Sequence, residues 1–270
     1  MDNKVWLITG ASRGLGRVWA EAALSRGDKV AATARKWADV ADLQERFGKN
    51  VLPLSLDVTE AEQVRQVVQQ AHQHFGKLDV ILNNAGYALA GSVEEVDEGE
   101  VRAQFDTNFF GVLRVIQAAL PLLRQQGSGH LVTVSSSVAI KEGEPLLGFY
   151  GATKWAIEGL HESLAKEIQA FGINVTLIEP GAYGTDFYSS AKEVPGMEAY
   201  ANLRSLVLES LANMAYGNPQ STAEAILRIV DAKEPPLRLV IGSEVLPMAR
   251  STYADRLATW EAWEEVSNRA

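Results

Sequence analysis

Short apolar segments rich in β-branched residues alternate with longer amphipathic segments along this chain, and this alternation limits the possible folds more than any other feature. The apolar segments are nearly continuous, which is typical of strands buried on both faces. Such strands, each separated from the next by a helix, form a parallel sheet covered by helices on both sides. We therefore predict an α/β fold: a single-domain, doubly wound, Rossmann-like parallel sheet of about seven strands. The predicted strands are residues 4–9, 28–34, 51–58, 78–84, 129–136, 173–180 and 237–242.

No linker, repeat or low-complexity tract divides the 270 residues, so one domain spanning 1–270 is predicted. Residues 186–216 interrupt the alternation with a mixed helical pattern and a Pro-Gly pair, and we interpret them as a substrate lid rather than a plain surface excursion. The C-terminal tail at 244–270 has a helical pattern. The predicted helices between strands reach to about residue 25, cover 37–48, 60–75 and 98–125, and begin again near residue 150.

Composition argues against several classes of protein. The chain has no cysteine, which excludes disulfides and thiolate metal sites, and its four histidines show no metal-ligand spacing, so no metal is expected. The net charge of −9 disfavours nucleic-acid partners. No apolar run approaches the roughly 20 residues that cross a bilayer, and the N-terminus shows no signal-peptide pattern. We therefore expect a cytosolic protein with no membrane partner.

A glycine-rich turn, "TGASRGLGR", follows the first predicted strand and contains Gly10, Gly14 and Gly16. The spacing G-x-x-x-G-x-G differs from the G-x-G-x-x-G dinucleotide fingerprint, but the physical reason for the glycines is the same. Glycines let the backbone turn sharply and approach a pyrophosphate, which then lies at a helix N-terminus. A plain strand–helix turn rarely needs three glycines, so this turn predicts a bound dinucleotide.

The end of the second predicted strand indicates which dinucleotide is bound. A free ribose 2′-hydroxyl is usually held by an acidic side chain at this place, whereas a 2′-phosphate needs a cation. The strand ends "TARK", with Arg35 and Lys36 and no acid, and Arg13 of the glycine turn can approach the same phosphate. The sequence therefore favours NADP(H).

Tyr150 and Lys154 lie four residues apart at the start of a predicted helix, so their side chains share one helix face. Alone, this spacing recurs by chance in ordinary helices. Its meaning depends on the motifs around it.

Several motifs in this order resemble the short-chain dehydrogenase/reductase family in its common form of roughly 250 residues. "TGASRGLG" is similar to the family's glycine turn, "NNAG" (83–86) to its N-N-A-G segment, and "YGATK" to its Y-x-x-x-K motif. "VSSSV" contains the family's serine, and "PGAYGT" (180–185) is similar to its P-G-x-x-x-T segment. The resemblance covers about residues 4–190. It implies an oxidoreductase that interconverts a ketone or aldehyde and an alcohol.

By this resemblance the catalytic residues are Asn108, Ser137, Tyr150 and Lys154. Tyr150 would be the general acid and base, and Lys154 would lower the pKa of its phenol and hold the nicotinamide ribose. Ser137 would bind the substrate oxygen, and Asn108 would hold a water that links Lys154 to solvent.

The choice among three consecutive serines rests on counting. The family's serine precedes the tyrosine by thirteen positions, which selects Ser137. Along an extended strand end, Ser136 would face the opposite side and Ser135 the same side, so Ser135 is the alternative.

The resemblance also implies the cofactor contacts. Tyr150, Lys154 and Arg35 are among them, and Tyr87, Tyr183 and Ser137 are candidates for contact with the substrate. The other predicted cofactor-binding residues are Gly10, Ser12, Arg13, Gly14, Leu15, Gly16, Asp57, Val58, Asn84, Ala85, Gly86, Pro180, Gly181 and Thr185.

Three other functions stay open: an NAD(H)-preferring alcohol dehydrogenase, a sugar-nucleotide epimerase or dehydratase, and a non-enzymatic NADP(H) sensor. The complete Ser, Tyr and Lys set favours an NADP(H)-dependent carbonyl reductase. The lid's apolar residues (Phe187, Tyr188, Met197, Tyr200, Leu203 and Leu206) suggest an apolar or aromatic substrate. We expect a homo-oligomer, a dimer or tetramer, although the tail with Trp260 and Trp263 departs from family members that end near the seventh strand.

Overall fold

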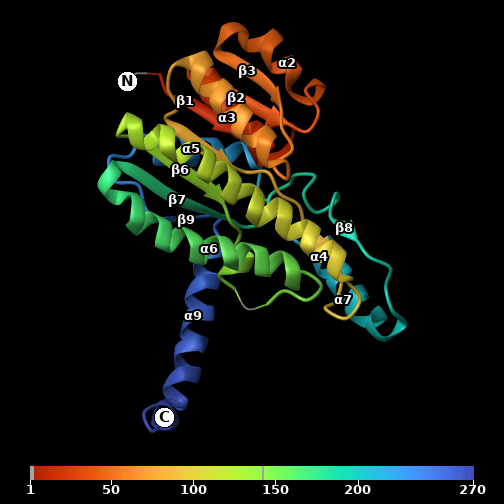
Figure 1. Cartoon of the computed structure of the whole chain (residues 1–270). Helices are drawn as coiled ribbons and strands as arrows, with labels where there is room; N and C mark the ends of the chain where they lie inside the picture. Colours follow the sequence, from red (N-terminus) through yellow and green to blue (C-terminus); the bar gives the residue numbers. More distant parts are fainter. Residues whose placement is uncertain (1–2, 142) are drawn as a thin grey trace.

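The computed structural model describes residues 3–141 and 143–270 and contains a seven-stranded parallel sheet (Figure 1). Its strand order is β3-β2-β1-β4-β6-β7-β9, so the chain reverses direction across the sheet after β3. The prediction of a doubly wound sheet is therefore confirmed. The strands are β1 (Val5–Ile8), β2 (Lys29–Ala34), β3 (Val51–Ser55), β4 (Val80–Asn83), β6 (Gly129–Val134), β7 (Ile173–Pro180) and β9 (Arg238–Ile241).

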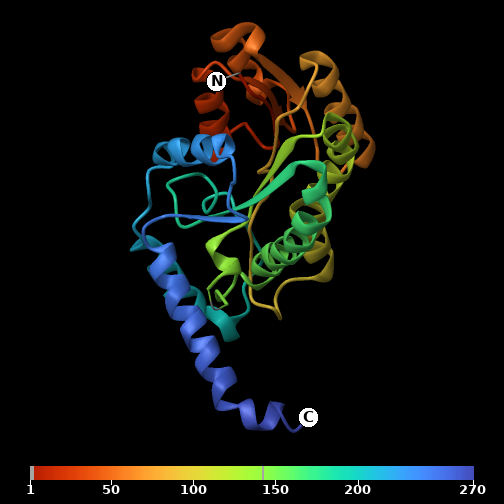
Figure 2. The same ribbon diagram turned by 90° about the vertical axis from the view of Figure 1, so that its left-hand side faces the viewer.

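Helices cover both faces of this sheet, as the edge-on view in Figure 2 shows. Successive strand residues point to opposite faces: Val5 and Leu7 of β1 pack toward one helical layer, and Trp6 and Ile8 toward the other. The first layer consists of α3 (Ala61–Phe75), α5 (Val112–Gln126) and α6 (Gly148–Ile168). The second consists of α1 (Gly14–Ser25), α2 (Ala38–Phe47) and α8 (Ala223–Asp231). Single-turn 3-10 segments cover Gly48–Asn50, Ser137–Ala139, Gln169–Phe171 and Pro219–Thr222.

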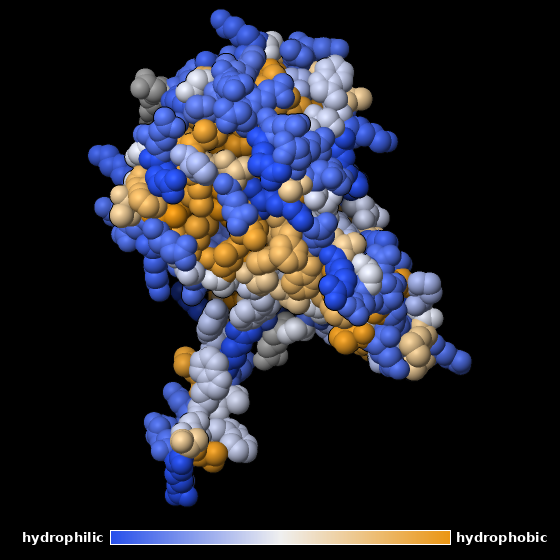
Figure 3. Space-filling view, in the orientation of Figure 1, coloured by the Kyte–Doolittle hydropathy of each residue, from blue (hydrophilic) through white to orange (hydrophobic). Residues whose placement is uncertain are grey.

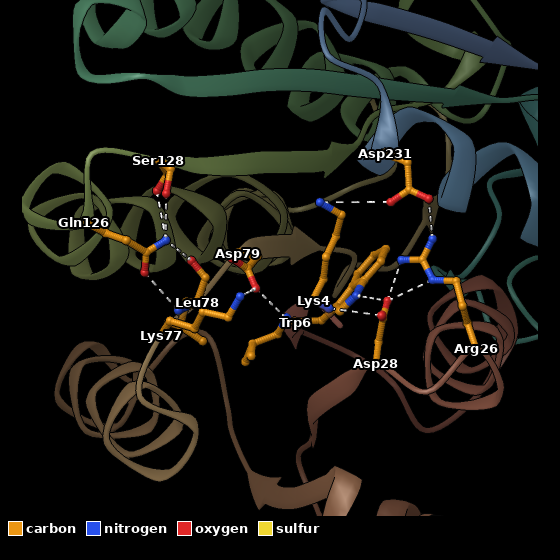
Figure 4. Close-up of polar contacts among 11 residues, drawn as sticks. Lys4, Trp6, Arg26, Asp28, Lys77, Leu78, Asp79, Gln126, Ser128 and Asp231 are labelled. Carbon is orange, nitrogen blue, oxygen red and sulfur yellow. Dashed lines mark hydrogen bonds and ion pairs between the residues drawn. The ribbon is translucent and has the colours of Figure 1, made fainter. Parts of the chain in front are cut away.

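Polar contacts join the segments at the amino-terminal ends of the strands (Figure 4). Asp28, immediately before β2, accepts hydrogen bonds from the Lys4 amide (3.1 Å) and from Trp6 Nε1 (2.8 Å), and it pairs with Arg26. Asp79 caps β1 by accepting from the Val5 amide (2.7 Å). These carboxylates satisfy backbone donors that the sheet leaves open.

The predicted helix over 98–125 is two helices joined by a π-helical turn. α4 (Glu98–Phe105) ends at Asp106–Gly111, which is π-helical, and α5 follows without a break. The sequence predicted one uninterrupted helix here and did not indicate the turn. π-Turns often occur at functional sites, and this one contains Asn108.

The segment predicted as a lid forms a second small layer beside the sheet. Its strand β8 (Lys192–Glu193) pairs in parallel with β5 (Leu89–Ala90), and a 3-10 turn (Glu198–Tyr200) leads into α7 (Ala201–Ala212). Glu95 holds the segment: it accepts from the Met197 amide (2.7 Å) and from Arg204 Nη2 (2.6 Å).

The C-terminal tail is helical, as predicted, with α9 (Val245–Ala262) followed by α10 (Glu264–Ser267). The first part of α9 contacts the body: Val245 and Thr252 are buried, and Arg256 lies over the Trp155 ring and donates to the Lys141 carbonyl (3.3 Å). The rest of α9 projects away, as Figures 1 and 2 show, and Trp260 and Trp263 are exposed. Within the described ranges, no helix combines the length and apolar character needed to cross a membrane.

Candidate active site

A cleft of about 750 Å³ opens at the carboxyl ends of the strands, where doubly wound sheets bind ligands. It brings together nearly all of the predicted site residues from distant parts of the chain. The predicted residues that line it are Gly10, Ser12, Arg13, Gly14, Leu15, Arg35, Asp57, Val58, Asn84, Ala85, Gly86, Tyr87, Tyr150, Lys154, Pro180, Gly181, Tyr183 and Thr185. Gly16, Asn108 and Ser137 do not line it and have other positions, described below.

One end of the cleft is suited to a phosphate group. Helix α1 begins there, its N-cap residue Arg13 makes no capping hydrogen bond with its side chain, and no acid lies in the first turn. The free backbone N–H groups of such a helix end attract anions. The glycine turn therefore fits the pyrophosphate of a dinucleotide.

The glycines of this turn are required by close packing. A Cβ added to Gly16 would lie 2.5 Å from the Gly10 carbonyl oxygen and 2.3 Å from Asn84 Nδ2. Gly10 itself has φ +69° and approaches Ala85. Gly16 therefore does not line the cleft. Its lack of a side chain lets α1 pack against the turn and against the segment after β4.

The two predicted phosphate-binding arginines differ in their surroundings. Arg35 is exposed at the rim of the cleft, just after β2. Arg13 donates from Nη2 to the Ser190 hydroxyl of the lid (3.1 Å). Arg13 thus links the glycine turn to the lid across the cleft, a contact that the sequence did not indicate.

Asp57, one of the predicted cofactor contacts, accepts hydrogen bonds from its own loop. Its Oδ1 accepts from the amide and the hydroxyl of Thr59 at 3.0 and 2.8 Å. This local turn shapes the wall of the cleft after β3.

The catalytic pair predicted from the sequence lies in the interior of the cleft. Tyr150 and Lys154 are in the first two turns of α6 and are both buried. The Lys154 ammonium lies 5.7 Å from the Tyr150 ring centroid and donates to the Val134 carbonyl at the end of β6 (2.8 Å). The helix therefore fixes both groups on one face, as the four-residue spacing predicted.

Burial shifts the pKa values of these two groups in opposite directions. It raises the pKa of Tyr150 above its usual value, although a hydrogen bond with the Ser136 hydroxyl acts against this. It lowers the pKa of Lys154 to about 8, with the Glu158 carboxylate acting in the opposite direction. The expected lowering of the Tyr150 pKa by Lys154 is not seen here, because loss of solvation of the phenolate dominates.

The serine that meets the tyrosine is Ser136. β6 ends at Val134, so the alternation assumed for an extended strand does not reach the serines. Ser136 caps the 3-10 turn, with its hydroxyl accepting from the Val138 amide (3.3 Å), and it lines the cleft together with Ser135. Ser137 is the first residue of that turn and lies outside the cleft lining, contrary to the prediction from counting.

Asn108 connects three segments around the cleft. Its Nδ2 donates to the Tyr87 carbonyl (2.9 Å) and to Thr153 Oγ1 (3.2 Å), and its Oδ1 accepts from the Tyr87 amide (3.1 Å). The side chain thus ties the π-helical turn to α6 and to the segment after "NNAG". Both N–H donors of the side chain and one lone pair of its oxygen serve this positioning.

An aromatic series leads outward from Tyr150. Neighbouring rings of Tyr150, Phe187, Tyr188 and Tyr216 have centroids 5.4, 5.6 and 5.7 Å apart, and Tyr216 is exposed. Of the apolar lid residues named from the sequence, Phe187 and Tyr188 line the cleft. Met197 and Leu206 do not, and both are exposed. Sequence reasoning also missed Ser190 and Lys192, for which no motif gives a signal.

No group of three or more His, Asp or Glu side chains in the described part of the chain could hold a metal ion.

Comparisons with known proteins agree with this geometry. The sequence model of the short chain dehydrogenase family matches residues 4–195. The chain is 43% identical to an oxidoreductase, BOA17, of Botryotinia fuckeliana over 98% of both chains. It is 38% identical to a 3-ketodihydrosphingosine reductase of Bacteroides thetaiotaomicron over 90% of this chain and 89% of that one. A crystal structure of a short-chain dehydrogenase from Streptomyces avermitilis superimposes with a TM-score of 0.91 at 36% identity, covering 99% and 98% of the two chains. The protein therefore belongs to the short-chain dehydrogenase family of oxidoreductases.

Proposed function

We propose that the protein is an NADP(H)-dependent reductase that interconverts a ketone or aldehyde and an alcohol. One observation carries the proposal: a buried phenol, a buried ammonium and a serine hydroxyl meet in a cleft that begins at a free helix N-terminus. This arrangement combines a dinucleotide site with a proton donor.

The chain's own residues would handle the proton and the substrate oxygen. NADPH, when bound, supplies the hydride to the carbonyl carbon. Tyr150 gives its phenolic proton to the carbonyl oxygen, and its raised pKa keeps that proton in place until it is needed. Ser136 donates a hydrogen bond to the same oxygen, and the Lys154 ammonium stabilises the phenolate that remains.

The pKa of Lys154 predicts how reduction depends on pH. The charged ammonium is needed beside the phenolate, and it loses its proton as the pH rises through about 8. Reduction should therefore be fastest below this pH and slower above it.

The preference for NADP(H) rests on cations and on a missing acid. Arg35 lines the cleft directly after β2, where an NAD(H) site usually has a carboxylate, and Arg13 lines the same cleft. A ribose 2′-phosphate bound beside Arg13 and Arg35 would meet guanidinium groups that match its charge and shape.

The aromatic series supports an apolar substrate. Phe187 and Tyr188 border the space beside Tyr150, and the rings continue to the surface at Tyr216. The name of the Bacteroides relative describes reduction of a ketone that carries a long hydrocarbon chain. We therefore propose aryl ketones and long-chain ketones as the substrate class.

The outer helical layer supports self-association as a dimer or tetramer. Apolar side chains gather over α5 and α6 in Figure 3. Phe110, Trp155 and Phe171 are large exposed side chains of this layer.

Tyr150→Phe tests the proposed function. The variant should lose turnover by at least about 10²–10⁴-fold, because only the proton donor is removed, and it should still bind NADPH. The assay follows NADPH absorbance with a panel of aryl, long-chain and short polar ketones. Substantial activity in the variant, or an unmodified protein that reduces none of the panel, would refute the proposal.

A further inference from the structure

Three charged side chains meet beneath the active site. Glu158 of α6, Glu179 of β7 and Arg238 of β9 converge between the helix and the sheet. Arg238 Nε lies 2.9 Å from Glu158 Oε2 and 3.5 Å from Glu179 Oε1, and the two carboxylate side chains are only 9% and 3% exposed. Two carboxylates therefore share one guanidinium in a poorly solvated place.

Glu158 follows Lys154 by one turn of α6, so their side chains lie on the same helix face. Lys154 is also buried, and among the described residues its ammonium donates a hydrogen bond to the neutral Val134 carbonyl. Glu158 Oε1 is buried and has no hydrogen-bond partner among the residues that the structure describes. The Glu158 carboxylate thus has one oxygen without a hydrogen bond to the described residues, and it shares a helix face with the buried Lys154 ammonium.

We propose that Glu158 is a positioning residue for the active site, whose buried negative charge keeps the Lys154 ammonium protonated at neutral and mildly alkaline pH. A charge one helical turn away acts strongly on its neighbour when both groups are poorly solvated. The proposal rests on the proposed function, in which Lys154 must be charged to hold the cofactor ribose and to stabilise the phenolate.

The titration behaviour of the surrounding groups agrees with this role. Burial lowers the pKa of Lys154 to about 8, and Glu158 opposes the shift. Burial and the nearby Glu158 raise the pKa of Glu179 to about 7, although the positive charge of Arg238 lowers it. Glu179 is therefore protonated in part at neutral pH. Burial lowers the pKa of His161 to about 4, so this neighbour stays neutral and adds no charge. Glu158 is then the buried carboxylate best placed to support Lys154.

Glu162 offers a matched control on the same helix. It also pairs with Arg238 (2.7 Å), but its side chain is 55% exposed, so water screens its charge. Glu162→Gln removes an ion pair of Arg238 without removing the buried charge beside Lys154.

The experiment measures the NADPH dissociation constant against pH for four proteins: the unmodified chain, Glu158→Gln, Glu162→Gln and Arg238→Gln. Because Lys154 holds the ribose only when charged, affinity should fall as this lysine loses its proton. In Glu158→Gln the midpoint of that fall should move down by about one pH unit or more. In Glu162→Gln the midpoint should not move.

Arg238→Gln separates a charge effect from a structural one. It breaks the same ion pair as Glu158→Gln, but it removes a positive charge, so the midpoint should stay or rise. If the midpoint falls in both variants, the cluster acts through packing and the proposal is wrong. It is equally overturned if Glu158→Gln keeps the unmodified midpoint. Should Glu158→Gln not fold, the Arg238→Gln midpoint still decides, since a fall contradicts the proposal and a rise supports it.

This binding measurement needs no carbonyl substrate. If NADPH binds with the expected shifts but no carbonyl compound is reduced, the proposed function fails and the role of Glu158 stands. If neither NADPH nor NADH binds, both are overturned.

Discussion

The Arg35 guanidinium can pair with a ribose 2′-phosphate, which NADPH has and NADH lacks. Arg35→Ala should weaken NADPH binding by about 1.5–3 kcal/mol, the range of charge-assisted hydrogen bonds, and leave NADH binding nearly unchanged. Lys36→Ala is the matched control, because Lys36 is equally exposed but does not line the cleft. Isothermal titration with both cofactors measures the difference. Equal losses for NADPH and NADH in the Arg35 variant would contradict the preference.

Ser136 lines the cleft together with Tyr150 and acts to lower the pKa of its phenol. Ser136→Ala should lower kcat by about 10²–10³-fold, as the loss of one oxyanion donor does. Ser137→Ala should have a small effect, because Ser137 lies outside the cleft lining. Steady-state rates of both variants decide the assignment, and a larger loss in the Ser137 variant would reverse it.

Counting residues back from Tyr150 did not identify the serine that lines the cleft. Ser136 precedes Tyr150 by fourteen residues rather than the thirteen that counting assumed. The offset depends on the length of the loop between the 3-10 turn and α6, and loop length is free to vary because the loop lies on the surface. Tyr150 and Lys154 were predictable because one helix fixes both, whereas Ser136 comes from a different element.

Among the elements, segment 186–216, which we propose to be a lid, is held in part by an enclosed carboxylate. The Glu95 side chain has no exposed surface, and its hydrogen bond with Arg204 lowers its pKa to about 2 against the effect of burial. Arg204→Gln should loosen the lid and raise the KM for the carbonyl substrate at least about tenfold, because the pocket wall loses its fixed position. The NADPH dissociation constant should change less.

Arg102→Gln is the control for this lid variant, because Arg102 pairs with Glu98 on the surface nearby and is 77% exposed. Its KM should stay at the unmodified value. An unchanged KM in Arg204→Gln would show that Glu95 does not hold the lid in solution.

Elements set by local pattern were predictable, and elements set by distant contacts were not. The seven strands and the helices around Tyr150 follow from apolar runs and periodicity. The π-helical turn at Asn108 depends on Tyr87 and Thr153, which lie far away in sequence. β5 and β8 are two residues each and gain stability only from one another, so no periodicity marks them. α8 was missed because it follows the irregular lid.

For the whole molecule, a cluster of buried polar contacts and the candidate active site lie at opposite ends of the strands. The Asp28 cluster lies where the strands begin, and the cleft lies where they end. Asp28→Asn should lower the free energy of unfolding by about 2–4 kcal/mol, because a buried carboxylate with several donors loses its charge. NADPH affinity of the folded variant should not change.

Asp231→Asn provides the comparison for Asp28. Asp231 binds the other side of Arg26 (2.7 Å) but is 28% exposed, so its loss should cost only about 0–1 kcal/mol. Urea unfolding measures both variants. A larger loss for Asp231 than for Asp28 would mean that burial does not determine the strength of this cluster.

The bond between Arg13 and Ser190 has a consequence for the order of events in turnover. It joins the glycine turn to segment 186–216, and both residues line the cleft proposed for the dinucleotide. A dinucleotide has to pass this bridge before the bridge closes, whereas a ketone approaches along the aromatic rings that end at Tyr216. We therefore expect a compulsory sequence in which the nucleotide enters first and leaves last, with the alcohol released between these two steps.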